Sequence, residues 1–292
     1  MTQISISHPD KVLFKSAGVT KQWLDDYYLK VATPLMQYAK GRPIAFKRYP
    51  HGYPGKNFFQ KNKPPYAPEW INSIKLGLHK AAEYITPTDI DTIRWLVNRE
   101  AIEFHTIQSK APNFMQPDIL VFDLDPPTTP EFSLNEQFSI VKKLALTIRP
   151  LIESFGYQTF PKTSGKKGIH IFCPVHPKNT YDEVFEAAKE IGIKIVSQTK
   201  NTTLKITKSE RINKTLIDIY RNHTLQSMSM PYGVRATEKV TVSMPLTWDA
   251  LAQLESPEIF TVFTVPAYLN KHGDAWAKIS EYSVDLHTKK AQ

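Results

Sequence analysis

The stretch DILVFDLD (118–125) limits the possible folds more than any other feature, because it is an apolar strand that ends in two aspartates two residues apart. Side chains alternate across a strand, so Asp123 and Asp125 point to one face, whereas Phe122 and Leu124 point to the other. Two carboxylates on one face repel each other, and their ionisation is costly unless a cation neutralises them. The stretch therefore predicts a strand with an acidic, cation-binding site on one face.

The elements after this strand follow a recognisable order. Apolar periodicity predicts helices over 136–155 and 180–197 and strands over 157–161, 168–175 and 215–220. The order β-α-β-β-α-β is the ferredoxin-like arrangement that RNA-recognition modules also use. In that topology the first strand lies between the third and the fourth. We therefore expect an α+β protein in which Asp123 and Asp125, His170 and Asp218 lie on three adjacent strands.

Three carboxylates gathered in this way suit hard divalent cations. Asp218 lies between Ile217 and Ile219 on an apolar strand, where a solvated charge is not expected. Oxygen ligands favour Mg²⁺ or Mn²⁺. Two such ions held by Asp123, Asp125 and Asp218 would form the apparatus for phosphoryl transfer, in which one ion activates a hydroxyl and the other steadies the leaving group.

The segment KTSGKKGIH (162–170) adds a candidate phosphate site. Ser164 and the two glycines allow a tight turn whose N–H groups can face an anion, and Lys166 and Lys167 add positive charge. The segment is not a Walker A motif, since the turn opens a strand and not a helix. His170 alternates with Ile169 and Ile171 and should share the acidic face. A plain hairpin turn with solvated lysines is the alternative.

The N-terminal part has a helix over 20–39 with Thr20 as its cap, then a strand over 44–50. Residues 51–80 are rich in Gly, Pro and Lys, which indicates an irregular surface loop. Phe58 and Phe59 beside lysines are either a stacking platform for nucleic acid or anchors of the loop to the core.

Composition narrows the class of partner but does not decide it. Lysine and arginine number 37 against 28 acidic residues, with a net charge of +9, which favours nucleic acid. No apolar run is long enough to span a membrane, and the N-terminus lacks the layout of a signal peptide, so a cytoplasmic location is expected.

The single Cys173 excludes an internal disulfide and is expected to be buried. Glu103 and His105 lack a third partner for zinc.

The ordered set of motifs resembles one known family. HPDKVLF, RPIAFKRYP, FFQK, EFH, VFDLDP, KTSGKKGIH, IDIYRN, PYGVR and VSMPLTW occur in this order. Together they resemble the polymerase domain of bacterial DNA ligase D, a member of the archaeo-eukaryotic primase superfamily, over about residues 5–277. The resemblance implies a primase-polymerase fold with an N-terminal α/β subdomain (1–115) and a catalytic subdomain with a C-terminal extension (116–292). It also implies template-dependent nucleotide addition at DNA gaps and breaks, with ribonucleotides preferred.

The resemblance also implies roles for particular residues. Asp123, Asp125 and Asp218 would hold two metal ions, with Mn²⁺ favoured. The nucleotide's phosphates would be contacted by Lys47, Ser164, Lys167, His170 and Arg235, and His105 would lie near the reacting phosphate or the primer terminus. Lys11 and Lys21 would contact a downstream 5′-phosphate, and Phe58 and Phe59 would stack on DNA. The family acts in non-homologous end joining with the end-binding protein Ku and a ligase, which implies a location at the nucleoid.

Two departures and two alternatives remain. Gly233 stands where the family pattern has serine, and residues 72–85 do not follow the pattern. The DLDPPT stretch also resembles the start of aspartate-nucleophile phosphatases, which would require a doubly wound parallel sheet. A non-catalytic nucleic-acid-binding module is the other alternative, and it would require aromatic side chains on the central strands where Asp and His stand.

Overall fold

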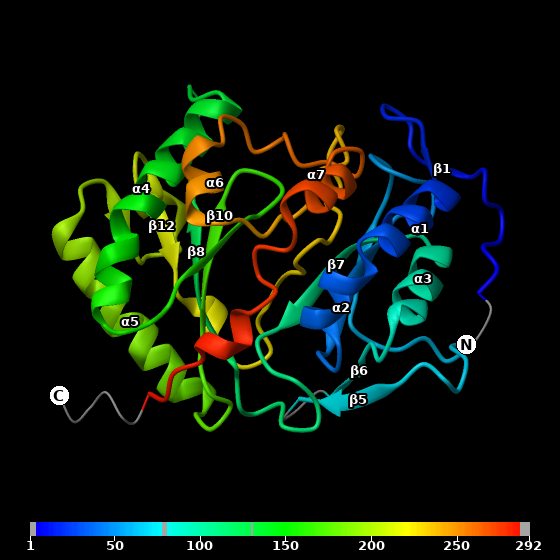
Figure 1. The fold of residues 1–292 in the computed structure, drawn as a ribbon, viewed down its shortest axis with the longest axis horizontal. Coiled ribbons are helices and arrows are strands. Elements are labelled where there is room, and N and C mark those ends of the chain that lie inside the picture. The colour runs from blue at the N-terminus through cyan, green and yellow to red at the C-terminus, as the bar shows by residue number, and fades with distance from the viewer. Residues whose placement is uncertain (1–3, 78–80, 130, 287–292) are drawn as a thin grey trace. The chain divides into compact units, whose positions relative to one another are not determined.

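A computed structural model describes residues 4–77, 81–129 and 131–286. The ends of the predicted domains (1–3 and 287–292) lie outside these ranges, as do residues 78–80 of the predicted loop and of the departure at 72–85. The chain, drawn in Figure 1, divides into two compact units. The first unit comprises residues 1–112, 227–244 and 258–274, and the second comprises 113–226, 245–257 and 275–292.

This division differs from the predicted one in its last third. The predicted boundary after residue 115 lies close to the change of unit at 112/113, but residues 227–244 and 258–274 belong to the first unit. The first of these segments joins the unit through a strand pairing, since β13 (Ser227–Ser229) pairs antiparallel with β7 (Ala101–Ile107). The second segment joins the first through the bridge between Thr241 and Thr261.

The second unit is built on a sheet in the order β11-β12-β8-β10-β9. The central strand β8 pairs antiparallel with both β12 and β10. This arrangement confirms the predicted order and the α+β class, and it excludes the parallel sheet that the phosphatase alternative required. The strands are β8 (Ile119–Asp125), β9 (Phe160–Thr163), β10 (Ile169–Pro174), β11 (Thr202–Thr203) and β12 (Thr215–Asp218).

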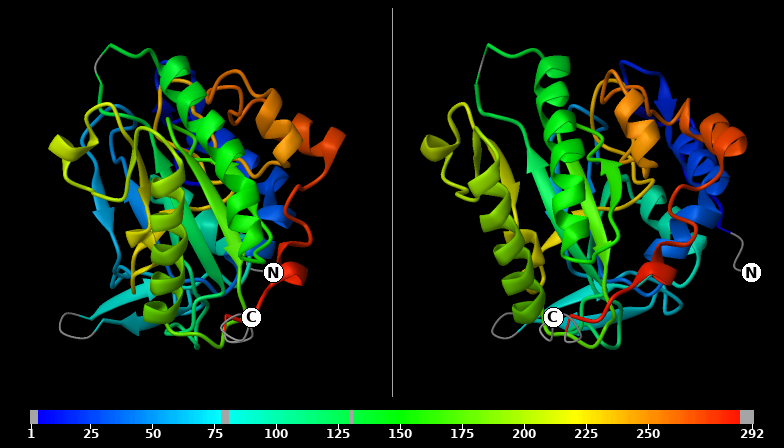
Figure 2. Two further views of the ribbon diagram at one scale, coloured as in Figure 1. Left: turned by 90° about the vertical axis from the view of Figure 1, so that its left-hand side faces the viewer. Right: turned by 60° about the vertical axis from the view of Figure 1, so that its left-hand side comes forward.

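Two long helices cover one face of this sheet, where they lie side by side (Figure 2). They are α4 (Leu134–Ser154) and α5 (Tyr181–Gln198). Each begins with a capping box, in which the Ser133 or Thr180 hydroxyl and the glutamate three residues later satisfy each other's backbone N–H groups. The apolar positions that face the sheet are buried, as is Cys173, whereas Ile193 on the outer face of α5 is exposed. The unit also contains α6 (Trp248–Gln253) and the 3₁₀ turns Lys208–Arg211, Tyr220–Asn222 and Ile279–Tyr282.

Strand β12 ends two residues before the predicted boundary at 220. The backbone N–H of Tyr220 donates to Asp218 Oδ1 at 2.9 Å, and the chain enters a 3₁₀ turn there. Short side chains such as aspartate often terminate a strand by bonding to the backbone in this way. Strand β9 begins at Phe160 and not at 157.

The first unit contains a larger sheet in the order β13-β7-β3-β6-β5, with β4 also paired to β3. Helices α1 and α3 pack against each other beside it. Besides β7 and β13, the elements of the first unit are β1 (Val12–Phe14), β2 (Val19–Thr20), α1 (Lys21–Lys30), α2 (Ala32–Ala39), β3 (Ile44–Arg48), β4 (Phe58–Gln60), β5 (Ser73–Leu76), β6 (Ala82–Ile85), α3 (Ile90–Asn98) and α7 (Val265–His272).

The predicted helix over 20–39 is two helices that meet at Val31. Pro34 has no N–H to donate to the carbonyl four residues earlier, so a continuous ladder is not possible there. Thr20 caps the first helix as predicted, accepting from the Trp23 N–H at 3.2 Å. The apolar face is buried throughout.

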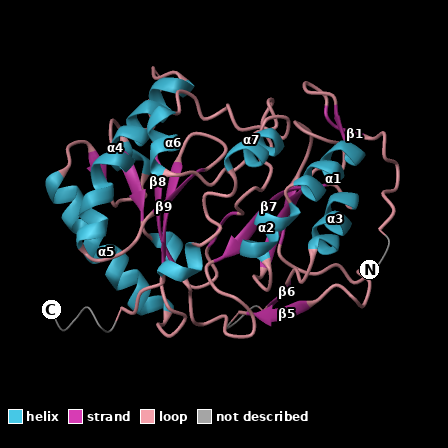
Figure 3. Cartoon of the chain, viewed as in Figure 1, coloured by secondary structure: helices cyan, strands magenta, loops and turns pink. Residues whose placement is uncertain are grey.

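The prediction of an irregular loop over 51–80 is wrong in two places. Strand β4 pairs with β3, and β5 pairs with β6, which lies beside it in Figure 3. Edge pairing satisfies their backbone groups. Neither strand buries a full apolar face, since Phe58 and Phe59 of β4 are exposed and Leu76 is the one buried residue of β5, so the apolar alternation that indicates a strand is missing. None of the helices in the described ranges combines the length and the apolar character of a membrane span.

Candidate active site

The three predicted aspartates lie together on the sheet of the second unit. Asp218 on β12 is directly opposite Asp123 on β8, and Asp125 is opposite Leu216. His170 on β10 is opposite Asp123 on its other side. Directly paired residues share a face, so an acidic row runs across adjacent strands. Asp123, Asp218 and His170 are all buried, with at most 7% of each residue exposed.

Burial makes this cluster electrostatically costly. The pKa of Asp125 is raised to about 7, first because burial disfavours its charged form and then because Asp123 repels it, and Arg211 opposes the shift. Burial also raises the pKa of Asp218, again against the effect of a nearby arginine, Arg221. Buried carboxylates that resist ionisation are a common property of sites that bind cations or move protons.

Two arginines and the histidine contact the acidic row. Arg221 Nε lies 3.1 Å from Asp218 Oδ2 and 3.3 Å from Asp123 Oδ2. Arg211 Nη2 lies 3.6 Å from Asp125 Oδ2, and His170 Nε2 lies 3.3 Å from Asp123 Oδ1. Sequence reasoning missed both arginines. Arg221 stands in the IDIYRN motif, but no spacing in the sequence indicates that its side chain contacts the aspartates.

The donor chemistry of the row fits hard divalent cations, because the acidic side chains offer oxygen atoms only. The side chains are nevertheless arranged around the arginines. In the described part of the chain, no three His, Cys, Asp or Glu side chains are gathered into a ready metal-binding group. The row is therefore a carboxylate–arginine cluster that has the ligand types for a metal site.

The KTSGKKGIH turn is organised by the hydroxyl of Ser164. Ser164 Oγ accepts from the backbone N–H groups of Lys166 at 3.1 Å and Gly168 at 3.0 Å. Two of the N–H groups predicted to face an anion are thus used inside the turn, while the Ser164 hydroxyl hydrogen remains as a donor. Lys167 is exposed. The turn adjoins the acidic row, because a Cβ on Gly168 would lie 3.6 Å from Asp125 Oδ1.

Asn222 holds the central strand where β12 ends. Its Oδ1 accepts from the Val121 N–H and its Nδ2 donates to the Val121 carbonyl, both at 2.8 Å. The side-chain amide thereby replaces one residue of a neighbouring strand. Asn222 is a positioning residue for the strand that carries Asp123 and Asp125, and the sequence analysis did not identify it.

Lys162 was also missed by sequence reasoning. It lies opposite His170 on β9, is fully buried, and places its ammonium 5.7 Å from the centre of the Phe172 ring. It therefore continues the row of polar side chains onto a fourth strand.

In the first unit, three other predicted residues lie around Glu103, and two of them, Lys47 and His105, share its sheet face. Lys47 is opposite Glu103, and His105 lies two residues further along β7 on the same face. Glu103, only 2% exposed, is contacted by His105 Nε2 at 3.6 Å and Arg235 Nε at 3.5 Å. The backbone N–H of Ala236 also donates to Glu103 at 2.9 Å. Glu103 thus fixes this basic group.

A second basic group surrounds Glu100. Lys11 Nζ lies 3.0 Å and Lys21 Nζ 3.3 Å from its carboxylate, and Arg48 Nη2 lies 3.6 Å away. Lys21 is buried and also donates to the carbonyl oxygens of Ser7 and Asn98. Lys11 is the more accessible of the two predicted lysines, with 35% of its side chain exposed.

Phe58 and Phe59 lie on β4, paired with Arg48 and Lys47. They are 45% and 48% exposed, which does not fit the alternative that they anchor a loop in the core. The Arg48 guanidinium lies 5.3 Å from the Phe58 ring centre, and the Phe59 ring lies 5.5 Å from that of His105. Aromatic faces beside cations are the arrangement that binds single-stranded nucleic acid.

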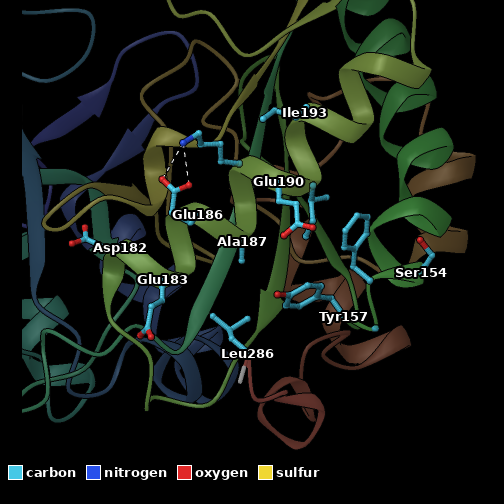
Figure 4. Close-up of a pocket in the computed structure, with 13 residues that line it drawn as sticks. Ser154, Tyr157, Asp182, Glu183, Glu186, Ala187, Glu190, Ile193 and Leu286 are labelled. Atoms are coloured by element: carbon cyan, nitrogen blue, oxygen red, sulfur yellow. Dashed lines mark hydrogen bonds and ion pairs between the residues drawn. The ribbon is translucent and has the colours of Figure 1, made fainter. Parts of the chain in front are cut away.

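A pocket of about 840 Å³ lies between the end of α4 and the first half of α5 (Figure 4). Four acidic side chains line it, and its Lys189 is paired with Glu186 at 3.0 Å. This excess of negative charge disfavours a nucleotide or nucleic acid there. The acids are Asp182, Glu183, Glu186 and Glu190.

The raised pKa of Asp125 predicts a pH-dependent stability for the metal-free protein. The folded pKa is about 7 against 3.8 for the free side chain. Between these values the folded state holds a proton that the unfolded state has lost, so this group's contribution to stability falls as pH rises from about 4 to about 7 and is constant above. Asparagine does not titrate, so Asp125→Asn lacks this pH dependence. Measured in chelator, the melting temperature of the wild type should therefore fall relative to that of Asp125→Asn as the pH rises over this range. Parallel melting profiles would contradict the prediction.

The second unit has the βαββαβ fold, with three aspartates on two adjacent antiparallel strands and a turn beside them that Ser164 organises. This combination is typical of a polymerase-type nucleotidyltransferase. The model of the family described as LigD, primase-polymerase domain, matches residues 20–276. The chain therefore belongs to the LigD primase-polymerase domain family.

Individual relatives agree with this assignment. The chain is 33% identical over 271 residues to the bifunctional non-homologous end joining protein LigD of Bacillus subtilis, covering 90% of this chain and 42% of that protein. It is 29% identical over 261 residues to the multifunctional LigD of Mycolicibacterium smegmatis, covering 87% and 33%. The solved polymerase domain of Mycobacterium tuberculosis ligase D in complex with DNA matches with a TM-score of 0.87 and 26% identity, over 97% of this chain and all of that one.

Proposed function

We propose that this chain is a template-dependent polymerase that adds nucleotides to DNA 3′ ends at gaps and breaks, with ribonucleotides preferred over deoxynucleotides. The observation that carries the proposal is the juxtaposition of Asp123, Asp125 and Asp218 on adjacent strands of a sheet of this family. Polymerases need carboxylates gathered in this way, because the reaction builds up negative charge on the transferred phosphoryl group.

Asp123, Asp125 and Asp218 would hold two Mn²⁺ or Mg²⁺ ions. When bound, these ions would supply activation of the primer 3′-hydroxyl and neutralisation of the departing pyrophosphate. The raised pKa values of Asp125 and Asp218 support the assignment, because both groups gain from a cation that offsets their burial.

The turn at 162–170 would bind the nucleotide's phosphates. Ser164 would donate its hydroxyl hydrogen, since its oxygen already accepts two backbone N–H groups, and exposed Lys167 would supply charge. His170 is buried against Asp123, which holds its ring in place. We assign the same class of contact to Lys47 and Arg235 and a position near the reacting phosphate to His105. The shared sheet face of Lys47, Glu103 and His105 and the contact of Arg235 with Glu103 support that assignment.

The DNA would be bound by the basic group at Glu100 and by the aromatic pair on β4. Three cations share one carboxylate there, so the group keeps an excess of positive charge for a 5′-phosphate. Lys11 is placed for direct contact, and Lys21 reaches a phosphate only by giving up one of its present acceptors. Phe58 and Phe59 would stack on an exposed base.

The biological setting follows from the names of the relatives. The chain spans less than half the length of the LigD proteins that it matches, which are described as non-homologous end joining proteins. We propose that it works in the same process at the nucleoid, with Ku at the DNA ends and a DNA ligase that seals the product.

The proposal is tested by primer extension on a short-gapped duplex with a 5′-phosphate at the gap. Ribonucleotides and deoxynucleotides are compared in Mn²⁺, in Mg²⁺ and in chelator. Templated addition that requires metal and favours ribonucleotides is the expected result. DNA binding without addition in either metal would instead support the non-catalytic nucleic-acid-binding alternative.

A further inference from the structure

The segment that carries Arg235 is held by two other elements of the first unit. Helix α1 contributes Tyr28, whose Oη accepts from the Val234 N–H at 3.1 Å. Strand β7 contributes Glu103, which accepts from the Ala236 N–H at 2.9 Å. The residues directly before and after Arg235 therefore have their backbone N–H groups bonded to buried side chains of distant parts of the sequence.

The phenol of Tyr28 has a fixed direction. Its ring is fully buried, and the ring centres of Tyr27 and Phe104 lie 5.2 and 5.5 Å away in edge-on contacts. Burial raises the pKa of Tyr28, so the phenol keeps its proton, and its O–H donates to the Ile102 carbonyl at 3.5 Å. A phenol oxygen that donates on one side presents its lone pairs on the other, where the Val234 N–H lies.

The side chain of Arg235 is enclosed, so its direction depends on the backbone. The side chain is 12% exposed, and its Nε lies 3.5 Å from Glu103 Oε1 without a hydrogen-bond acceptor in the described part of the chain. The Arg235 N–H donates to the Thr241 carbonyl at 2.7 Å, which anchors the residue to the next segment. With that anchor in place, the position of Val234 decides in which direction the guanidinium leaves the backbone.

We propose that Tyr28 is a positioning residue for Arg235 and acts through the N–H of Val234. The inference rests on the proposed function, in which Arg235 contacts the phosphates of the nucleotide. A guanidinium binds phosphate well only when its planar fork of donors is aimed at the oxygens. Tyr28 sets that aim from one side of the segment, while Glu103 holds the other side. Loss of the phenol oxygen leaves a buried N–H without its acceptor, and the segment shifts to relieve that cost.

The test is steady-state addition of a single nucleotide to a gapped duplex by the full chain, with the nucleotide triphosphate titrated in Mn²⁺. Tyr28→Phe keeps the ring and removes the oxygen. It should raise the KM for the nucleotide by about tenfold and keep kcat within about twofold, which is the pattern of a lost binding contact. Its affinity for gapped DNA should equal that of the wild type. Each variant is assayed well below its own melting temperature, so that global unfolding does not enter.

A double variant separates positioning from a general loss of stability. If Tyr28 acts through Arg235, adding Tyr28→Phe to Arg235→Gln should change the KM of the latter by less than about twofold. The matched control is Tyr84→Phe, which removes the phenol oxygen of another buried tyrosine of the first unit, on β6. That variant should keep the KM of the wild type.

Each other outcome overturns the inference in an identifiable way. No addition by the wild type would overturn the proposed polymerase function, and a wild-type KM in Arg235→Gln would remove Arg235 from the proposed phosphate contacts. A raised KM in Arg235→Gln beside an unchanged KM in Tyr28→Phe would leave the phosphate contact in place and remove the positioning role. The same factor from Tyr28→Phe with and without Arg235 would show that Tyr28 acts by another route. Equal rises of KM in Tyr28→Phe and Tyr84→Phe would show a general effect of lost stability.

Discussion

An Asp218→Ala variant is expected to lose at least about 10³-fold in the rate of nucleotide addition while its affinity for DNA stays within about twofold. Asp218 is buried opposite Asp123, where it serves as one of three acidic side chains that the proposed metal ions require. The residues that we assign to DNA are Lys11, Phe58 and their neighbours in the first unit. Single-nucleotide incorporation and fluorescence anisotropy with labelled gapped DNA measure the two quantities separately.

Two controls make the result interpretable. Asp182→Ala removes an exposed acid from the start of α5 and should leave both quantities nearly unchanged. Asp218→Asn keeps an oxygen that can accept from the Tyr220 N–H, so it separates loss of the charge from loss of that hydrogen bond. Nucleotide addition near the wild-type rate in Asp218→Ala would remove Asp218 from the proposed metal ligands.

Sequence reasoning located the acidic row because two regular rules were enough. Alternation along DILVFDLD placed Asp123 and Asp125 on one face, and the order of helices and strands placed β8 between β10 and β12. Residues on neighbouring strands then meet however far apart they are in the chain. The same two rules place His170 and Asp218 on the strands beside Asp123, whereas the register that sets both directly opposite it comes from the structure.

The parts that sequence reasoning missed depend on local geometry that has no periodic signal. Arg221 reaches the acidic row only because β12 ends in a 3₁₀ turn, and that turn depends on a hydrogen bond from Tyr220 to Asp218. Strand β4 was taken for a loop because the stretch around it is rich in Gly, Pro and Lys, and its adjacent phenylalanines, both exposed, do not alternate with polar residues. The return of residues 227–244 to the first unit depends on the β13–β7 pairing, which a two-part division of the chain cannot express.

The proposed roles of Lys47, His105 and Arg235 have a different origin. They came from the resemblance to the ligase D polymerase family, since spacing alone assigned no chemical role to any of them. The structure adds that all three lie around one buried carboxylate, Glu103. A glutamate at the centre of three basic side chains limits their positive charge and fixes their directions, so we regard Glu103 as the residue that positions this group.

Gly168→Ala is expected to cause the largest combined loss of stability and activity of any single-methyl change at the site. A Cβ at this position would lie 2.6 Å from the carbonyl oxygen of Leu124, which belongs to the backbone of β8. Real Cβ atoms do not approach a backbone oxygen so closely, and a strand in the middle of a sheet cannot yield as a flexible side chain does. The expected loss of stability is about 2–4 kcal/mol, typical of a buried steric conflict.

The same displacement should reach the chemistry directly, because Leu124 lies between Asp123 and Asp125. A shift of the strand by a fraction of an ångström moves both carboxylates, and misplacement of about 1 Å can cost roughly 10²-fold in rate. The control is Gly18→Ala, whose Cβ meets nothing within 4 Å but whose φ of +65° carries backbone strain. That variant should lose about 1–2 kcal/mol of stability and keep its activity. If Gly168→Ala melted and turned over like the wild type, the contact between the turn at 162–170 and β8 would not be as tight as the distance of 2.6 Å indicates, and the turn could not be what sets the position of Asp125.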